Sequence, residues 1–387
     1  MFGSRRALTR AVGRVRGMVY LDHAATSPLC REAREAMAPY LDDRFGNASE
    51  PHSYGREARR GVEQARHTLC QLLGCEPAQL VFTSGGSEAD NQAVFGLAGR
   101  PLGRLVVSEI EHPAVRAPAQ ELERQGFEVA WIPVDSDGVL DVGAFRDALR
   151  EDDRLAAVMW ANNVTGAVQP IAELAAACAE RGVPLHVDAV QAAASLPVDF
   201  RSSGVETLAL SAHKMHGPKG VGALIARDPS RLRPLIWGGG QERGLRSGTE
   251  NVAGIVGFAA ALAAMRTRID RRGELRDRLE RSLPELRVIS AGAARLPGHS
   301  LLLVEGIRAD LLVLALDRAG YAVSAGSACA SGESEPSRAL IAQGLSPDEA
   351  RSVVRVSIGI DSTAEEVDGF AAALRECIER LRAGALV

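Results

Sequence analysis

The sequence predicts an α/β protein with a large, doubly wound and mostly parallel sheet, followed by a smaller α+β domain. The first observation is an alternation, from about residue 80 to residue 226, of short β-branched runs with amphipathic stretches of helical length. The second is a change near residue 251, where a long helical stretch is followed by fewer strand-like runs and a long final helix. A chain of 387 residues is long enough for two or three domains with a large buried core.

The first region alternates expected strands with expected helices, one of which covers residues 88–97. The expected strands are residues 80–83, 104–108, 128–132, 156–160, 185–188, 207–211 and 221–226. Ligands of open parallel sheets bind beyond the carboxyl ends of the strands. The residues that directly follow these runs are therefore the first candidates for a functional site.

The second region predicts the smaller domain, which the long helix joins to the first. Its expected elements are strands at residues 287–290, 300–304 and 353–358 and helices at about residues 310–319 and 363–382. We divide the chain into four parts: a disordered basic extension (1–17), a segment that packs with the small domain (18–30), the large domain (31–258) and the small domain (259–387).

The composition is that of an ordinary soluble protein whose partners are small molecules. Apolar residues make up 46%, charged residues make up 24%, and the formal net charge of −4 gives no basic excess for direct nucleic-acid binding. The longest apolar stretch, residues 252–265, is shorter than the ~20 residues that span a bilayer. We expect a buried helix there and no membrane partner.

The cysteines and the N-terminus bear on location. The six cysteines form no CxxC pair and no dense framework, which favours a reducing cytoplasm. The first seventeen residues hold five arginines and no acid, as an organelle-targeting peptide does. Because Met18 stands directly before the first strand-like run, we favour a misassigned start and a disordered basic tail.

Lysine occurs only twice, as Lys214 and Lys219, although lysine and arginine together number 45. Arginine stays protonated, whereas a lysine amine can lose its proton and condense with an aldehyde. The pair therefore favours pyridoxal phosphate chemistry. The alternative is that the richness in arginine reflects genomic base composition and that two lysines remain by chance.

The glycine-rich segment 83–88 follows one expected strand and opens an expected helix. Backbone amides at such a helix start can approach an anion, and the positive end of the helix favours negative charge. The segment is therefore a candidate phosphate loop. The alternative is a plain glycine turn with Ser87 as the N-cap of the helix.

Asp188 ends another expected strand, and Gln191 follows about one helical turn later. A buried carboxylate in this place can keep a pyridine nitrogen protonated, and Gln191 can donate to the ring oxygen. The spacing from Asp188 to Lys214 matches the way in which pyridoxal enzymes of the aspartate-aminotransferase fold hold both ends of the ring. The alternative is a solvated aspartate at a strand end.

Taken together, these segments resemble the cysteine desulfurases of the class V aminotransferase group, from about residue 19 to the C-terminus. The matching blocks are residues 20–26, 45–49, 82–88, 109–112, 162–163, 186–191, 211–220, 238–244 and 246–249. The resemblance implies fold type I of the pyridoxal phosphate-dependent transferases, which is aspartate-aminotransferase-like, and pyridoxal 5'-phosphate as the cofactor. It implies no metal.

The resemblance also implies roles for single residues, by matching position. Lys214 would form the Schiff base with the cofactor, and His112 would stack on its pyridine face and assist proton transfers. Asp188 would pair with the ring nitrogen, and Gln191 with the phenolic oxygen.

The remaining implied ligands surround the phosphate and the substrate. The implied phosphate ligands are Gly86, Ser87, Ser211, His213 and, from the other subunit of an obligate homodimer, Thr249. Asn163 would lie near the phenolic oxygen and the substrate carboxylate. Arg355 would hold that carboxylate, a task that suits the two-pronged guanidinium group.

Cys329 separates this interpretation from other members of the fold. It lies in a run of small, polar and turn-forming residues, and Pro336 is placed to begin the next helix. Such a loop can move and can present a thiolate to a substrate sulfur, whereas the other five cysteines fall mostly in expected helices or at their ends. The long spacing from Cys329 to residues 335–337 resembles the NifS- and IscS-like group with an extended mobile loop.

The implied activity is the conversion of L-cysteine to L-alanine, with the sulfur passed as a Cys329 persulfide to an acceptor protein. That acceptor could serve iron–sulfur clusters, other thio-cofactors or nucleic-acid modification, and nothing in the sequence identifies it. Alternatives are a selenocysteine lyase or another class V enzyme such as a transaminase or epimerase, and a catalytically silent scaffold. Two departures from the family pattern, Val164 for a glutamate and Ser87 for a threonine, remove no residue with an assigned role.

Overall fold

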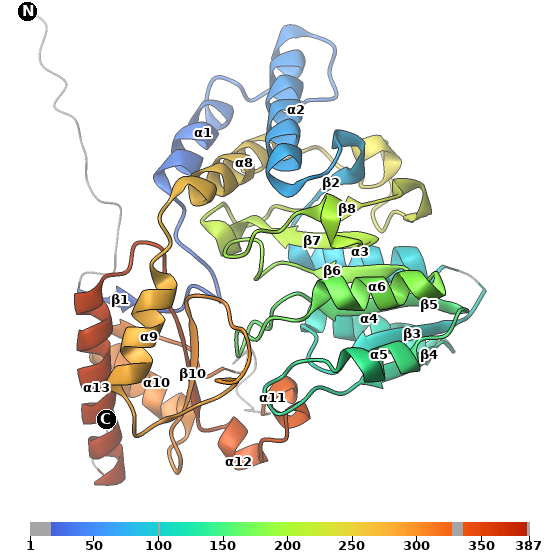
Figure 1. Cartoon of the computed structure of the whole chain (residues 1–387). Coiled ribbons are helices and arrows are strands. Elements are labelled where there is room, and N and C mark those ends of the chain that lie inside the picture. Colours follow the sequence, from blue (N-terminus) through green and yellow to red (C-terminus); the bar gives the residue numbers. More distant parts are fainter. Residues whose placement is uncertain (1–16, 100, 327–335, 385–387) are drawn as a thin grey trace, which may run out of the picture.

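The structure is a computed structural model that describes residues 17–99, 101–326 and 336–384. The expected disorder of the basic extension, apart from residue 17, and the position of Cys329 fall outside the described residues. Figure 1 shows a large sheet flanked by helices and, beside it, a smaller unit formed mainly by the C-terminal part of the chain.

The large sheet has seven strands in the order β2-β8-β7-β6-β5-β3-β4. Strands β4, β3, β5, β6 and β7 are parallel to one another, and β8 is antiparallel to both β2 and β7. The strands are β2 (Leu80–Thr83), β3 (Arg104–Ser108), β4 (Glu128–Ile132), β5 (Asp153–Met159), β6 (Leu185–Asp188), β7 (Thr207–Ser211) and β8 (Gly222–Ala226). The predicted α/β class with a mostly parallel sheet is confirmed.

Strand β5 begins three residues before its expected start at residue 156. Its first residue, Asp153, is buried because its Oδ1 lies 2.9 Å from Nη1 of Arg104 on the neighbouring strand β3. Strands were predicted here from runs of apolar residues. A strand that begins with a buried charged residue does not fit that pattern. The predicted strand therefore left out the first three residues of β5.

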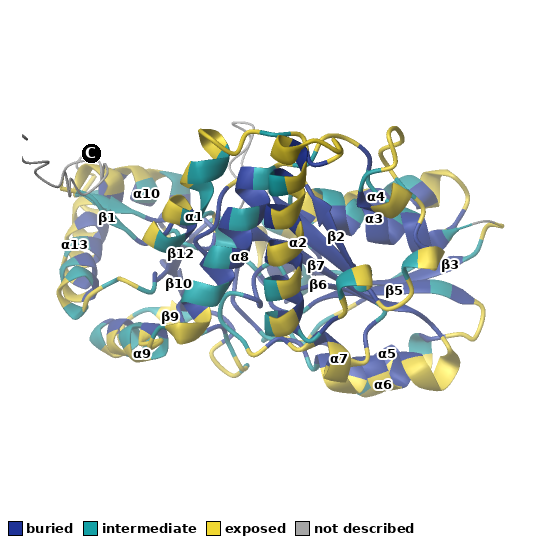
Figure 2. Cartoon of the chain, turned by 90° about the horizontal axis from the view of Figure 1, so that it is seen from above, coloured by how far each residue is buried: buried dark blue, intermediate teal, exposed yellow. Residues whose placement is uncertain are grey.

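Helices cover both faces of the sheet (Figure 2). Helices α3 (Gly86–Ala98) and α4 (Pro113–Arg124) lie on one face, and α5 (Val142–Ala148), α6 (Ile171–Arg181) and α7 (Phe200–Ser203) lie on the other. Leu105 and Val107 of β3 belong to the core on the α3 side, whereas Val106 belongs to the core on the α6 side. This division follows because successive side chains of a strand point to opposite faces.

Three helices pack beside the β2 end of the sheet (Figure 1), namely α1 (Arg31–Leu41), α2 (Ser53–Leu73) and α8 (Val252–Thr267). The apolar stretch 252–265 is helix α8, and most of its side chains are buried, as predicted. Among the described residues, no single helix has the length and hydropathy to cross a bilayer; α8 and α9 (Arg272–Ser282) meet that test only when taken together, across a 68° bend.

The smaller unit contains an antiparallel three-stranded sheet in the order β12-β10-β9. Its strands are β9 (Arg287–Val288), β10 (His299–Leu303) and β12 (Val353–Ser357). Its helices are α9 (Arg272–Ser282), α10 (Ala309–Arg318), α11 (Arg338–Ala342), α12 (Pro347–Ala350) and α13 (Ala364–Arg382). Leu302, Leu316 and Phe370, from β10, α10 and α13, meet in one buried cluster that is separate from the cores of the large sheet.

The N-terminal segment connects the two units. Strand β1 (Val19–Tyr20) pairs in parallel with β11 (Tyr321–Ala322) of the smaller unit. Farther along, the amides of Ser27 and Cys30 donate to the carbonyl oxygens of His213 and His216, at 2.9 and 3.0 Å. The segment therefore runs from the smaller unit to the loop that carries the candidate lysine.

The end of helix α8 bears on where the large domain ends. A boundary between residues 258 and 259 would cut this helix, whose later residues Leu262 and Met265 still pack in a core of the large sheet. We propose that the large domain ends at Thr267, where α8 ends.

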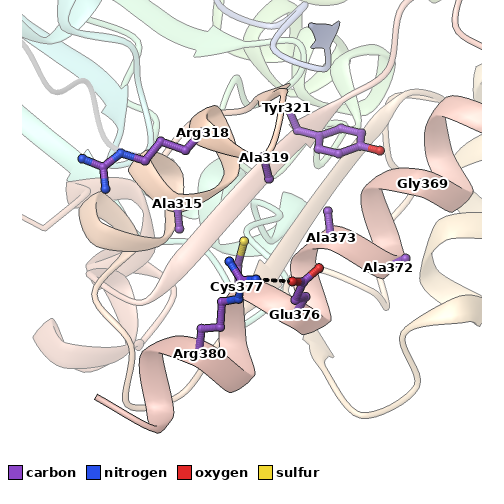
Figure 3. Close-up of a pocket in the computed structure, with 10 residues that line it drawn as sticks. All are labelled: Ala315, Arg318, Ala319, Tyr321, Gly369, Ala372, Ala373, Glu376, Cys377 and Arg380. Atoms are coloured by element: carbon purple, nitrogen blue, oxygen red, sulfur yellow. Dashed lines mark ion pairs between the residues drawn. The ribbon is translucent and has the colours of Figure 1, made fainter. Parts of the chain in front are cut away.

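A cavity of about 770 Å³ lies between α10, α13 and β11 (Figure 3). Its walls include the small side chains of Ala315, Ala319 and Ala373, and Glu376 on α13 forms an ion pair with Arg380 at 2.7 Å. None of the residues predicted for the functional site lines this cavity.

Candidate active site

A second cavity, of about 250 Å³, lies at the carboxyl ends of three central strands. Met159, Asp188 and Ser211 are the last residues of β5, β6 and β7, and all three line it. The other lining residues are Gly86, Ser87, Asp90, His112, Asn163, Val190, Gln191, His213 and Lys214. The structure thus brings together most of the predicted site residues, at the edge of the sheet that the strand-end rule indicated.

The start of α3 forms one part of this cavity. The helix begins at Gly86, and its N-cap is Gly85, which has no side chain to cap it. The interpretation of Ser87 as N-cap is therefore wrong, because Ser87 lies inside the first turn. The first backbone bond of the helix runs from the amide of Ala89 to the carbonyl of Gly85, so the amides of Gly86, Ser87 and Glu88 have no backbone partner within the helix and can face an anion.

Gly86 also allows close packing at this point. A Cβ atom at Gly86 would lie 2.6 Å from Cγ2 of Val190, a residue of the cavity wall just after β6. A side chain there would push the start of the helix away from the ends of the central strands. The glycine is thus required for the helix start to border the cavity.

Lys214 follows β7 on a short 3-10 helix, η2 (Ala212–Met215). Its Nζ donates to the carbonyl oxygens of Ala24 and Ala25, at 2.6 and 2.8 Å. Burial and, to a smaller extent, Arg355 lower the pKa of Lys214 to about 8, against the opposing effect of Asp188 and Asp22. The amine therefore loses its proton far more readily than that of an exposed lysine.

Asp188 and Gln191 approach the cavity from the end of β6. Oδ1 of Asp188 accepts the amide of Val190 at 2.9 Å, and burial raises the pKa of this carboxyl, although His112 and Lys214 favour its charged form. Nε2 of Gln191 donates to the carbonyl of Ala24 at 2.9 Å, the same oxygen that Lys214 contacts.

His112 is the N-cap of α4, and its Nδ1 accepts the amide of Ala114 at 3.1 Å. Because Nδ1 is the acceptor, the neutral ring carries its proton on Nε2. Burial lowers the pKa of His112, and Lys214 acts in the same direction, whereas Asp188 opposes them. The ring is thus fixed in orientation and favours its neutral form.

Arg355, on β12, does not line the cavity but lies at its border with the smaller unit. Its Nη2 lies 2.7 Å from Oδ1 of Asp22, and its Nη1 donates to the carbonyl of Asn163 at 2.9 Å. Its Nε is buried and has no hydrogen-bond partner within the described part of the chain. The guanidinium is thus held beside Asn163 with one donor still unpaired.

Of the other predicted phosphate ligands, His213 and Ser211 line the cavity, whereas Thr249 does not. Nδ1 of His213 lies 3.1 Å from Oγ1 of Thr26, and burial lowers the pKa of His213 to about 4, with Lys214 and Lys219 acting in the same direction. Ser211 is buried at the end of β7. Thr249 is exposed and does not line the cavity of its own chain.

Cys329 itself is outside the described residues, but both ends of the segment that contains it adjoin the site. On one side, Ser324 exchanges two backbone hydrogen bonds with Arg355, at 3.2 and 2.8 Å. On the other, Ala339 of α11 packs with Ile110 and with Met159, a residue of the cavity wall. The five cysteines that the structure describes are all buried and unpaired.

Several residues of the site were not among those predicted. Asp22 pairs with Arg355, and Asp90, Met159 and Val190 line the cavity. Asp22 lies inside the matching block 20–26, so that block carried a signal for it. Asp90 lies inside a helix and carried no such signal.

Comparison with known proteins agrees with this geometry. The family model described as aminotransferase class-V matches residues 19–370. A cysteine desulfurase of Cereibacter sphaeroides is 44% identical over 381 residues, covering 94% of this chain and 97% of the relative. The solved structure of a NifS-like protein has a TM-score of 0.87 and 32% identity, covering 95% of this chain and all of that one. The structure titled SspA in complex with cysteine has a TM-score of 0.81 and 34% identity, over 89% and 99% of the two chains.

The chain therefore belongs to the class V aminotransferase family, with the α/β fold of the type I pyridoxal phosphate-dependent enzymes. Within that family it is a cysteine desulfurase, and such enzymes depend on pyridoxal phosphate.

Proposed function

We propose that this chain binds pyridoxal phosphate in the 250 Å³ cavity, converts L-cysteine to L-alanine and receives the sulfur as a persulfide on Cys329. The observation that carries the proposal is that one cavity brings together an amine with a lowered pKa (Lys214), a buried carboxyl (Asp188) and an uncapped helix start (Gly86). Each of these groups suits a different part of the same cofactor.

The donor set fits that cofactor. The backbone amides at the start of α3 and the hydroxyl of Ser211 can donate to a phosphate. Because Gly86 has no side chain, the helix start borders the cavity where this phosphate would bind. A primary amine at Lys214 suits the aldehyde, and a buried carboxylate at Asp188 suits the ring nitrogen.

We assign the individual contacts accordingly. Gly86, Ser87, Ser211 and His213 would hold the phosphate, Asp188 the ring nitrogen, Gln191 and Asn163 the phenolic oxygen, and His112 one face of the ring. When bound, the cofactor supplies an electron-withdrawing ring that stabilises negative charge at the substrate α-carbon.

Lys214 is the base that removes the α-proton in this proposal. A base works best when its pKa lies near the working pH, and burial brings the pKa of Lys214 to about 8. His112, neutral and with its proton on Nε2, lines the same cavity and can pass a proton there.

Arg355 and Asn163 position the substrate. The guanidinium of Arg355 can bind a carboxylate through paired hydrogen bonds from Nε and its terminal nitrogens. For this, the substrate carboxylate would replace Oδ1 of Asp22 as the partner of Nη2. The Asn163 carbonyl that accepts from Nη1 keeps the guanidinium beside the cavity.

We infer that Cys329 can reach a substrate that is bound beside Arg355. Ser324, bonded to Arg355, is five residues before it, and an extended chain covers about 3.3–3.6 Å per residue. In the step itself the Cys329 thiolate attacks the substrate sulfur, and a sulfur–sulfur bond forms. The carbon–sulfur bond breaks, and its electron pair stays with the carbon, which takes a proton and becomes the methyl group of alanine.

We also propose that the enzyme is a homodimer. Phe45 and Trp237 are large apolar side chains that are 71% and 78% exposed, and Tyr54 packs against Phe45 with ring centroids 5.3 Å apart. Exposed aromatic clusters mark protein interfaces. Thr249, exposed in its own chain, would then reach the phosphate of the partner subunit's cofactor.

The compartment follows from the thiols. The five described cysteines are unpaired, and the reaction needs Cys329 as a free thiol. We therefore place the enzyme in a reducing cytoplasm.

Two measurements test the function. Purified protein is expected to show the visible absorbance band of bound pyridoxal phosphate, which Lys214→Ala abolishes, and to form alanine and sulfide from L-cysteine in the presence of a thiol reductant. Turnover of selenocysteine that Cys329→Ser leaves unaffected, together with no turnover of cysteine, would instead indicate a selenocysteine lyase. Radiolabelled cysteine would then show which protein receives the sulfur.

A further inference from the structure

Three acidic side chains are buried together at the wall of the cavity. Asp90 on α3, Glu111 just before α4 and Asp188 at the end of β6 are 1%, 7% and 6% exposed. Asp90 and Asp188 both line the cavity. The charges of Asp188 and Glu111 both raise the pKa of Asp90, so the three groups act directly on one another.

Asp90 faces a neutral partner. Its Oδ1 lies 3.2 Å from Nε2 of His186, and Nδ1 of that ring lies 2.9 Å from Oγ1 of Thr207. His186 is fully buried, and burial lowers its pKa to about 3, so the ring carries no charge to compensate a carboxylate. A proton on Asp90 would complete a chain of hydrogen bonds from Asp90 through His186 to Thr207.

Glu111 has partners on one oxygen only. Its Oε1 accepts from Oγ of Ser108 at 2.5 Å and from the amide of Met159 at 2.6 Å. Its Oε2 is buried and has no hydrogen-bond partner among the described residues. Burying a charged carboxylate that has one oxygen without a hydrogen bond costs far more free energy than burying the neutral acid.

The basic side chains nearby act on Asp188 instead. His112, from the start of α4, and Lys214, from η2, favour the charged form of Asp188, whereas neither is among the groups that act on Asp90 or Glu111. In the part of the chain that the structure describes, no lysine or arginine pairs with Asp90 or Glu111. Three buried like charges cannot all be ionised at once.

We propose that Asp90 and Glu111 are positioning residues that remain protonated and thereby confine the negative charge of this trio to Asp188, the carboxyl assigned to the cofactor's ring nitrogen. The proposal rests on the proposed function for that last role only. Burial raises the pKa of Asp90 well above its ordinary value and that of Glu111 to about 8, which agrees with the geometry.

The first test uses the cofactor-free chain and a pH profile. A carboxyl with a raised pKa in the folded state stabilises the fold at low pH, and this contribution falls as pH rises from its ordinary 4.5 to about 8. The free energy of unfolding of wild type, measured in urea across this range, is therefore expected to fall more steeply than that of Glu111→Gln, and likewise Asp90→Asn. Equal slopes for wild type and both variants would overturn the proposal, and a merely structural role would change stability without changing the slope.

The second test uses pyridoxal phosphate and an absorbance titration. An amide has the charge of a protonated acid, so Asp90→Asn and Glu111→Gln are expected to keep an affinity close to that of wild type, whereas Asp188→Asn loses at least about tenfold, or 1.4 kcal/mol. A tenfold loss for Asp90→Asn would show that Asp90 carries the charge. If wild type binds no pyridoxal phosphate, the proposed function fails, while the stability profile of the cofactor-free chain still decides the protonation of Asp90 and Glu111.

Discussion

At the scale of single residues, the chemistry depends on what burial does to ordinary side chains. Lys214 would be a cation in water, but desolvation and Arg355 bring its pKa to about 8. Burial lowers the pKa of His112, and the amide of Ala114 orients its ring. A free amine and a neutral imidazole in one cavity are the requirements of proton transfer at a substrate carbon.

This environment of Lys214 predicts a pH dependence. Only the neutral amine condenses with an aldehyde, so the rate at which pyridoxal phosphate attaches to the cofactor-free chain is expected to rise with pH and to level off above about 8. Stopped-flow absorbance measures it. Arg355→Gln should move the midpoint to higher pH, because Arg355 lowers the pKa of Lys214, and Asp22→Asn should move it to lower pH. A wild-type midpoint near 10.5, the ordinary value for lysine, would contradict this account.

Part of the site could be read from the sequence and part could not. Asp188 ends β6 and Lys214 follows β7, so the rule of strand ends indicated them. Asp90 and Met159 look like ordinary members of a helix and a strand, and only the packing of α3 against the ends of β5 and β6 makes them line a cavity. The pairing of Arg355 with Asp22 joins residues 333 positions apart, which no local pattern encodes.

At the scale of the elements, the site depends on how closely α3 approaches the sheet. The predicted strands were largely correct, because β2, β3, β6 and β7 are buried along their whole length and strands buried on both faces are continuous apolar runs. These four strands and the partly exposed edge strand β4 occupy the expected residues. Helices α1 and α2, which precede the sheet, were not among the expected elements. The close contact of Gly86 with Val190 arises from tertiary packing, and a glycine in the sequence does not by itself predict such a contact.

The contact at Gly86 predicts a specific defect. In Gly86→Ala the new Cβ would lie 2.6 Å from Val190, so the start of α3 must shift and the affinity for pyridoxal phosphate is expected to fall at least about tenfold. Equilibrium titration by absorbance measures it. Gly273→Ala on α9 is the matched control, because its Cβ would meet Pro297 at an ordinary 3.9 Å. Equal affinity of the two variants would contradict the role of the helix start.

Helix α2 is tied to the sheet by a buried ion pair. Arg66 of α2 donates to both oxygens of Glu242, at 3.0 and 2.7 Å, and the same carboxylate accepts the amide of Phe82 on β2 at 2.9 Å. Glu242 and Arg243 both have positive φ, 48° and 58°, a conformation that this pair helps to hold.

Removal of one partner is expected to be costly. Glu242→Ala leaves Arg66 charged and buried, which destabilises the fold by about 3–5 kcal/mol. Urea unfolding gives the value. Glu35→Ala is the control, since its pair with Arg31 is exposed and contributes at most about 1 kcal/mol. A loss for Glu242→Ala no greater than that of the control would refute the structural role of the pair.

At the scale of the whole molecule, the segment of residues 18–30 and the border at Arg355 join two units around one site. The segment pairs with the smaller unit at β11 and with the Lys214 loop at His213. Both ends of the Cys329 segment adjoin the same border, at Arg355 and at Met159. In the proposed function, the smaller unit would supply the substrate anchor and the thiol, and the larger unit the cofactor cavity.

The assembly is predicted from the exposed aromatic side chains. Trp237→Asp and Phe45→Asp are expected to shift the proposed dimer toward monomer in analytical ultracentrifugation. They are also expected to lower activity, because in that proposal each cavity would lose Thr249 of the partner subunit. Ile269→Asp is the control, since Ile269 is 80% exposed on the connection between α8 and α9. Unchanged sedimentation of both aromatic variants would argue against this interface.

The most direct measurement is to locate the sulfur after one turnover. Wild-type holoenzyme is mixed with one equivalent of ³⁵S-labelled L-cysteine without reductant, digested, and read by mass spectrometry for an additional sulfur atom on Cys329, with alanine counted in parallel. The account predicts label on the Cys329 peptide in proportion to alanine, and none in Cys329→Ser, which should still bind the cofactor. Alanine formed at the wild-type rate by Cys329→Ser, or label on another residue of the wild type, would contradict it.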